Sequence, residues 1–243
     1  MKRSIVGIAL LVLLIPTMAI ANQVRFRGYL DNSIGIKLGY FMPNGKSDLW
    51  DYNAEYLTMS VEDFNRTSVG IELNFGVNNY LDIGIGADFY RRSIPTEYRD
   101  WTDEFGYPIE QTISLRIVPL TFTAKILPLG RWRVPGPRER RTLNSVIPYV
   151  GGGVGLYFWR YEEVGDYIDF YDMTIYTTFF LSKGTDVGFH LLGGVEIPIG
   201  SNWSVTAEMR YNIIKGPLSA DFVGFEEFDL GGITASGGFL FRF

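Results

Sequence analysis

The sequence contains no cysteine and only one histidine among its 243 residues. The absence of cysteine excludes a disulfide scaffold, an iron–sulfur cluster and a thiolate zinc site, and one histidine is poor material for a histidine-based metal site. Basic residues are also too few for a nucleic-acid binder, because 22 Lys and Arg stand against 27 Asp and Glu, a net charge of −5. We therefore expect no metal and no cofactor.

Long hydrophobic runs are missing except at the N-terminus. There, two basic residues (2–3) precede an apolar stretch (5–15) that Pro16 interrupts. The stretch is shorter than the roughly 20 residues that cross a bilayer as a helix. Ala19-Ile20-Ala21 matches the small-x-small pattern of a cleavage site. We therefore predict a signal peptide over residues 1–21, cleaved near Ala21, with a retained membrane anchor as the alternative.

The remainder of the chain alternates apolar residues with glycine, polar and charged ones. The alternation occurs in eight segments: 33–41, 68–77, 81–89, 112–126, 147–159, 187–199, 203–213 and 231–243. Because a strand turns successive side chains to opposite faces, each segment has one apolar face and one small-or-charged face. The fourth segment changes phase near Val118 and Pro119, which predicts a β-bulge there.

The charges on the polar faces are few and balanced. We predict a lumen charge network of Lys37, Glu72, Asp82, Asp88, Arg116, Glu196, Glu208, Arg210 and Arg242, and Lys125 lies on the same polar faces. Balanced charge suits a closed interior, where buried charges must pair, and glycine leaves room there for long side chains. The pattern therefore predicts an all-β fold, an eight-stranded antiparallel up-and-down transmembrane β-barrel with lipid around its apolar faces. A soluble periplasmic barrel that binds an apolar ligand inside is one alternative.

Two motifs carry a resemblance to a known family. The segment Pro148-Tyr149-Val150-Gly151-Gly152-Gly153-Val154-Gly155 and the end Gly238-Phe239-Leu240-Phe241-Arg242-Phe243, in a chain that begins with a signal peptide, resemble the small outer-membrane β-barrels of Gram-negative bacteria, the group of the OmpA transmembrane domain, OmpX and OmpW. The resemblance covers nearly all of residues 33–243, the predicted barrel, and leaves 22–32 as a short periplasmic segment.

The resemblance implies a location and partners. It implies export to the periplasm, insertion into the outer membrane, and contact with outer-membrane lipids and lipopolysaccharide. It also implies that Phe239, Phe241 and Phe243 form the signal read by the barrel-assembly machinery. It leaves the role open, because such proteins serve as anchors, adhesins, narrow channels and carriers of small hydrophobic compounds. We expect a structural role, or the binding or passage of small molecules, without covalent chemistry.

An outer-membrane enzyme that modifies lipid A is the leading alternative. It would depend on His190, the only histidine, which lies on the polar face of its segment. Lipid A deacylases carry a His-x-Ser pair, whereas Leu191 and Leu192 follow His190 here. Ser182 and Asp186 lie nearby in the sequence, but nothing fixes their geometry.

Short links join the second to the third segment and the sixth to the seventh. Longer links occupy 42–67, 91–111, 160–186 and 214–229, and all four are acidic, whereas 127–146 is basic. We expect divalent cations to bridge the acidic loops to lipopolysaccharide and the basic residues 131–141 to meet inner-leaflet phosphates. Segment 160–186 also alternates with period two. It either prolongs the flanking strands above the membrane or forms a fifth hairpin and a ten-stranded barrel.

Overall fold

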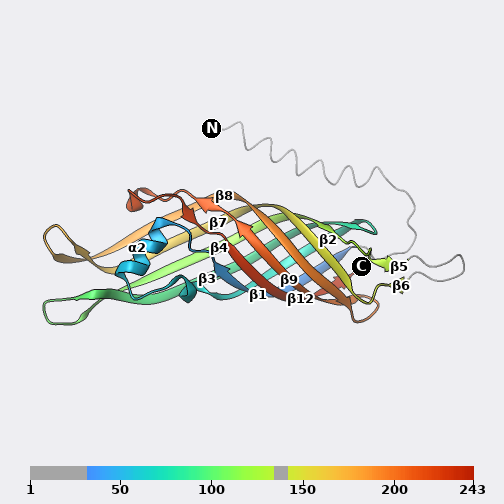
Figure 1. Cartoon of the computed structure of the whole chain (residues 1–243), viewed down its shortest axis with the longest axis horizontal. Helices are drawn as coiled ribbons and strands as arrows, with labels where there is room; N and C mark the ends of the chain where they lie inside the picture. Colours follow the sequence, from blue (N-terminus) through green and yellow to red (C-terminus); the bar gives the residue numbers. More distant parts are fainter. Residues whose placement is uncertain (1–31, 134–141) are drawn as a thin grey trace, which may run out of the picture. The chain divides into compact units, whose positions relative to one another are not determined.

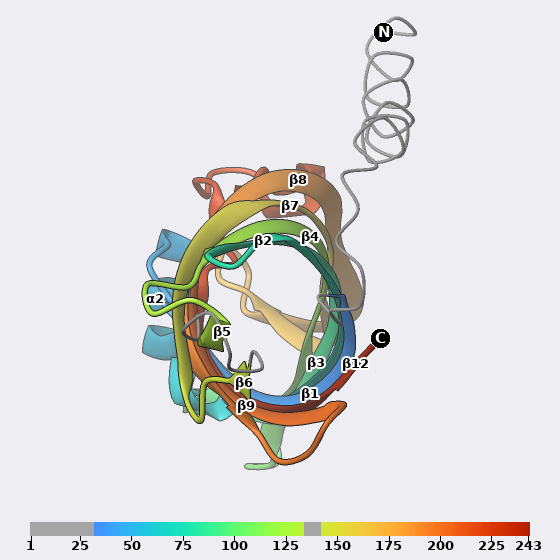
Figure 2. The ribbon, with the colours of Figure 1, turned by 90° about the vertical axis from the view of Figure 1, so that its right-hand side faces the viewer.

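The computed structural model describes residues 32–133 and 142–243, so the predicted signal peptide lies outside the described residues. Eight long antiparallel strands form a closed barrel in the order β1-β12-β9-β8-β7-β4-β3-β2, which Figure 2 shows end-on. The elements are β1 (Ser33–Pro43), α2 (Asp48–Tyr56), η1 (Val61–Phe64), β2 (Arg66–Asn78), β3 (Leu81–Thr102), β4 (Pro108–Ile126), β5 (Trp132–Arg133), β6 (Thr142–Leu143), β7 (Ile147–Asp169), β8 (Thr174–Pro198), β9 (Trp203–Ile213), β10 (Lys215–Gly216), η2 (Ala220–Phe222), β11 (Phe228–Asp229) and β12 (Gly232–Arg242).

The eight strands fall into two length classes. Strands β1, β9 and β12 have 11 residues and β2 has 13, close to the 9–11 residues that a tilted strand needs to cross a bilayer. Strands β3, β4, β7 and β8 have 19 to 25 residues, about twice that length. Their hairpins extend beyond α2 at one end of the barrel (Figure 1). In the outer-membrane barrels that the sequence resembles, the end with long hairpins is extracellular and the end with short turns is periplasmic, and we name the two ends of this barrel accordingly.

The long hairpins test two predictions, namely which segments are long links and whether the barrel has eight or ten strands. Segments 91–111 and 160–186, expected as long links, are mostly strand, with turns only at 103–107 and 170–173. Segment 160–186 prolongs β7 and β8, which pair from Ile147↔Glu196 to Asp169↔Thr174. The prediction of eight strands is therefore confirmed, and the ten-stranded alternative is wrong. None of the described helices is long and apolar enough to cross a membrane.

The outside of the barrel is apolar around its periplasmic half. Ile36 is 64% exposed and Leu191 61% exposed, while Lys37, between Ile36 and the next outward residue, is only 7% exposed. The wall thus turns aliphatic and aromatic side chains outward and charged ones inward. This is the arrangement of a barrel surrounded by lipid, and the reverse of a soluble barrel.

The polarity of both faces inverts along the long strands β3 and β4, whereas the outer face of β8 keeps exposed Phe179 and Ile175. On β4 the outward side chains change from Phe122 and Leu120 to Arg116, while the inward ones change from Thr123 to Ile113, which is fully buried. The predicted β-bulge near Val118 is wrong, because β4 pairs with β7 without a shift from Gln111 to Ile126. The strand keeps its phase and its surroundings change. The periplasmic, or lower, half of the strand lies between lipid and the charged lumen, whereas the extracellular, or upper, half lies between water and an apolar core.

The extracellular half encloses its own hydrophobic core. Its buried members include Phe41, Trp50, Phe64, Tyr90, Ile94, Ile113, Leu115, Trp159, Tyr161, Phe222 and Phe228. Helix α2 contributes Leu49, Trp50 and Asn53 from its buried face. The Trp50 ring packs 4.9 Å from Phe64 and 5.1 Å from Phe228 between ring centroids. Aromatic residues of the β1–β2 and β9–β12 connections therefore cover the upper end of the barrel.

Candidate functional site

Six charged side chains meet in the membrane-spanning part of the lumen. Lys37 Nζ lies 2.5 Å from Glu72 Oε2 and 3.2 Å from Glu208 Oε1. Lys125 Nζ lies 3.2 Å from Glu72 Oε2 and 3.6 Å from Glu208 Oε2. Arg210 completes the cluster through Glu208, at 3.1 Å, and Asp88, at 2.9 Å. Three cations and three carboxylates thus form a neutral network, which we call the charged plug.

Two further ion pairs close the lumen toward the periplasm. Arg242 pairs with Glu196, and Arg131, from the β4–β7 connection, pairs with Asp82. Tyr149 donates a hydrogen bond of 3.1 Å to Glu208 and connects the plug to this layer. The tyrosine ring needs the glycine opposite it, because a Cβ atom on Gly194 would lie 2.7 Å from the Tyr149 hydroxyl oxygen. Glycine here makes room for a ring that fills the lumen.

Little empty space remains around the plug. The lumen cavities that border it measure about 40 Å³ on the extracellular side and about 10 Å³ on the periplasmic side. Tyr157 and Trp159, both buried, and the core above them continue the filling toward the extracellular end. The lumen around the plug therefore has room for a few water molecules and not for a solute in transit.

The structure places eight of the nine predicted lumen residues inside the barrel. Arg116 is the exception, because its side chain is exposed on the outer face. It lies above the point where polarity inverts, so an apparent change of phase in the sequence assigned it to the wrong side. Lys125 joins the plug as its polar-face position indicates. Sequence reasoning missed Arg131, which was assigned to a basic turn and not to the lumen, and most of the remaining turn (134–141) lies outside the described residues.

His190 lies inside the barrel and has no catalytic partners. It is 1% exposed, and its Nε2 shares a hydrogen bond of 2.9 Å with Thr123 Oγ1. Ser182 lies eight residues along the same strand, about 26 Å away at 3.3 Å per residue, and its Oγ accepts a bond from Ser219 N. Asp186 accepts a hydrogen bond from Trp159 Nε1. No triad is assembled here.

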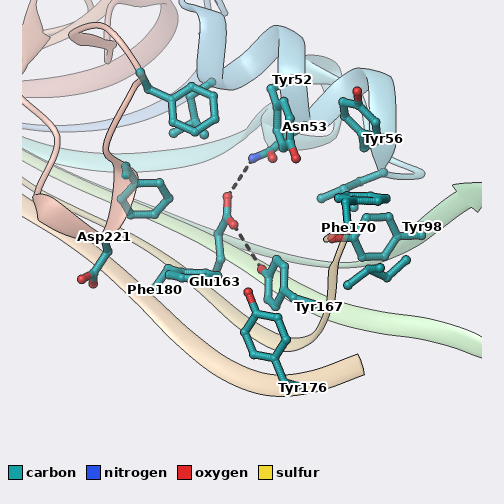
Figure 3. A pocket seen from close by; sticks show the side chains of 15 residues that line it. Tyr52, Asn53, Tyr56, Tyr98, Glu163, Tyr167, Phe170, Tyr176, Phe180 and Asp221 are labelled. Atoms are coloured by element: carbon teal, nitrogen blue, oxygen red, sulfur yellow. Dashed lines mark hydrogen bonds between the residues drawn. The ribbon is translucent and has the colours of Figure 1, made fainter. Parts of the chain in front are cut away.

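A second site lies at the extracellular end. A cavity of about 270 Å³ is bounded by α2, β3, β7, β8 and η2 (Figure 3). Nine of its lining residues are aromatic: Tyr52, Tyr56, Tyr98, Tyr167, Phe170, Tyr176, Phe180, Phe222 and Phe225. Tyr52, Phe170 and Tyr176 are about two-fifths exposed and form its rim. Sequence reasoning missed this site, because its residues come from five separate segments.

A carboxylate lies at the floor of this cavity. Glu163 is 4% exposed, and its Oε1 accepts hydrogen bonds from Asn53 Nδ2 at 2.7 Å and Tyr161 Oη at 2.6 Å. Its Oε2 accepts one from Tyr167 Oη at 3.1 Å (Figure 3). Burial raises the pKa of the Glu163 carboxyl, although these hydrogen bonds favour the ionised form. Burial and the nearby Glu163 also raise the pKa of the Tyr167 hydroxyl, so that it stays a donor.

A row of cations marks the upper edge of the apolar belt. Arg91 pairs with Arg116 across β3 and β4, Arg116 with Arg160 across β4 and β7, and Arg160 with Lys183 across β7 and β8. All four belong to the outer face, directly above apolar Phe89, Val118 and Phe158. Of these four residues, only Arg160 has an acidic side chain of the described part of the chain within 4 Å, which is Glu162. We call these four residues the basic row.

Metal ligands are not grouped anywhere in residues 32–133 and 142–243. No three His, Cys, Asp or Glu side chains there lie close enough to hold a metal ion. The expected binding of divalent cations to the acidic loops therefore depends on diffuse negative charge alone and stays a prediction.

The closed wall, its apolar exterior and its charged interior define a transmembrane β-barrel. The family model of the outer membrane protein beta-barrel domain matches residues 7–243, and the chain belongs to this family. The protein is therefore an outer-membrane protein of a Gram-negative bacterium and lies among the lipids and lipopolysaccharide of that membrane. No curated protein matches the sequence.

Three solved outer-membrane proteins are similar to this chain, and the first of them shows the same fold. The outer membrane protein OprG from Pseudomonas aeruginosa aligns with a TM-score of 0.53 at 12% identity, over 90% of this chain and 99% of that one. Neisserial surface protein A aligns with a TM-score of 0.48 at 14% identity, over 88% and 97%. Ail of Yersinia pestis, solved with the heparin analogue sucrose octasulfate, aligns with a TM-score of 0.41 at 12% identity, over 87% and 96%.

Proposed function

We propose that this protein is a closed, non-enzymatic barrel that binds small molecules at its extracellular end and does not pass them through its lumen. The observation that carries the proposal is the charged plug. A neutral network of six charges, five of them buried, with short ion pairs is costly to open, because removing one partner leaves an uncompensated buried charge. A binding role then falls to the extracellular half, which has a cavity lined by aromatic side chains.

Enzymatic chemistry on lipid A has no support from the geometry around His190. The ring is buried in the lumen, away from the lipid on the outer face, and Ser182 and Asp186 are engaged elsewhere. A general base must reach both its nucleophile and a substrate. We therefore interpret His190 as part of the lumen packing.

The basic row supports contact with the phosphates of lipopolysaccharide. Like charges directly opposite one another destabilise a sheet, so four adjacent cations are unfavourable in an isolated barrel. Their place at the extracellular edge of the apolar belt is where lipid phosphates lie. An anionic partner in the outer leaflet would turn this unfavourable arrangement into a favourable one.

Planar-bilayer recordings test closure. We expect the purified protein to show no steady conductance, because the lumen around the plug is filled. A stable channel of uniform conductance would contradict the proposal.

Saturation-transfer NMR with small cationic, anionic and neutral aromatic compounds tests binding. We expect binding that Phe170→Ala weakens and Tyr107→Ala does not, since Tyr107 is exposed in the β3–β4 turn and does not line the cavity. Absence of binding by every class of compound would also contradict the proposal.

A further inference from the structure

Aromatic rings form a nearly continuous collar around the extracellular cavity. Successive rings lie within 6.5 Å of each other in the order Phe225, Tyr52, Tyr56, Phe170, Tyr98, Tyr167, Phe180 and Phe222. The two ends of this series are only three residues apart in the chain, and Phe225 N donates a hydrogen bond to the Phe222 carbonyl oxygen. The rings therefore surround the cavity below its exposed rim, and aromatic rings carry a negative π-face that attracts a cation.

The charge of the cavity has one sign. Two of its lining residues, Glu163 and Asp221, are carboxylates, and none is Lys, Arg or His. Glu163 is held by three neutral donors and has no basic side chain within 4 Å among the described residues. Buried carboxylates are ordinarily paired with a cation. A ligand could therefore supply the cation that the Glu163 carboxylate lacks.

We propose that this collar is an aromatic cage for an alkylated ammonium group, with the Glu163 carboxylate as its counter-ion. Aromatic faces attract a quaternary ammonium, which has no N–H to donate, and a buried carboxylate adds the opposite charge. The inference depends on the proposed binding function and names its ligand class.

The size of the cavity limits the ligand. Drug-sized ligands occupy pockets of about 300–1,000 Å³, and this one measures about 270 Å³. It therefore suits a trimethylammonium head with a short chain. The exposed rings of Tyr52, Phe170 and Tyr176 leave the upper side open, so such a group can enter head first.

The experiment compares choline with its neutral isostere 3,3-dimethyl-1-butanol, which has the same shape without the charge. Calorimetry is done on the full-length folded protein in a maltoside detergent, because phosphocholine detergents would compete. We expect choline to bind at least about tenfold more tightly than the isostere, a difference of about 1.4 kcal/mol. Equal affinities would overturn the proposal.

Two variants locate the site. Glu163→Gln keeps the size and the acceptor oxygen but removes the charge, and we expect it to weaken choline binding about tenfold or more. Glu162→Gln is the matched control, because this neighbour faces outward and pairs with Arg160. Tyr56→Leu, in the aromatic collar, should also weaken choline binding and provides a second test if Glu163→Gln does not fold. An unchanged affinity in both site variants would overturn the proposal.

The outcomes separate this inference from the proposed function. If neutral compounds bind in the cavity and choline does not, the cage is wrong and the binding function stands. If neither binds, the binding function itself is wrong.

Discussion

Glu163 is the residue at which stability and binding make opposite demands. Burial raises the pKa of its carboxyl, so the folded protein takes up this proton more readily than the unfolded chain. The stabilisation is fully present below the unfolded pKa of 4.5 and is lost as the pH rises through the raised folded value. A cation bound in the cavity would restore the stability that is lost when the Glu163 carboxyl ionises.

This linkage predicts a pH dependence that one substitution abolishes. The wild-type extracellular half, without ligand, should unfold at lower urea concentration as the pH rises from 4.5 to neutrality. Glu163→Gln should flatten this dependence and be at least as stable as wild type at neutral pH. The facing titratable groups are Tyr161 and Tyr167, whose pKa values burial raises, and Asp221, for which Asp221→Asn is the control. Tryptophan fluorescence follows the unfolding, and an unchanged slope in Glu163→Gln would contradict the assignment.

Inside the membrane, Lys37 is the residue on which the stability of the charged plug depends. It contacts both Glu72 and Glu208, and all three side chains are buried. Lys37→Met should destabilise the barrel by about 3–5 kcal/mol, because two carboxylates then share one fewer cation. Lys215→Met, at an exposed position outside the barrel wall, should change little. Urea unfolding in lipid bilayers measures both, and a loss under about 1 kcal/mol for Lys37→Met would mean that the plug is not a stabilising network.

At the scale of the element, β4 shows both the success and the limit of pattern reading. Period-two alternation predicted the strand and the apolar side that faces lipid, because burial in lipid and burial in a core select the same residues. The alternation does not say which face is inside, and this strand crosses from lipid to water along its length. Arg116 was therefore assigned to the lumen, although the register with β7 is unbroken. The extension of β3 and β4 over 91–111 was expected as a link for the same reason, whereas prolonged strands were one of the two outcomes expected for 160–186.

The basic row gives the element-scale prediction. In bilayers without lipopolysaccharide, Arg116→Gln should stabilise the protein slightly, by about 0.2–1 kcal/mol, because it relieves repulsion from Arg91 and Arg160. In bilayers that contain lipopolysaccharide the same change should destabilise it, because phosphate contacts are lost. The reversal of sign is the diagnostic result. Lys215→Gln, away from the row, should show no reversal, and the same sign in both membranes would refute the phosphate contact.

At the scale of the whole molecule, the two halves solve different physical problems. The lower half pairs its charges inside and turns apolar side chains to lipid, while the upper half folds like a water-soluble domain around aromatic residues. Residues of the plug could be predicted, because they share one face of regular strands. The cavity could not, because Asn53, Tyr98, Glu163, Tyr176 and Phe222 come from segments that only the closed barrel brings together.

This division predicts that the extracellular half unfolds without the barrel. Trp50 is 1% exposed, packs on Phe64 and Phe228, and donates a hydrogen bond of 3.2 Å to the Asp229 carbonyl oxygen. Trp50→Ala should cost about 3–5 kcal/mol, because it leaves a cavity in this core. Helix α2, which contains Trp50, supplies four residues that line the extracellular cavity, so ligand binding there should be lost.

The membrane-spanning strands, however, keep every backbone hydrogen bond and the charged plug. The variant should therefore retain the heat-modifiable gel migration of a folded barrel while limited proteolysis cleaves the connections 44–65 and 214–231. Tyr107→Ala, at an exposed turn, should resist cleavage like wild type. If Trp50→Ala instead lost folded-barrel migration together with its protease resistance, the two halves would form one cooperative unit, and the extracellular cavity could not be altered without the membrane anchor.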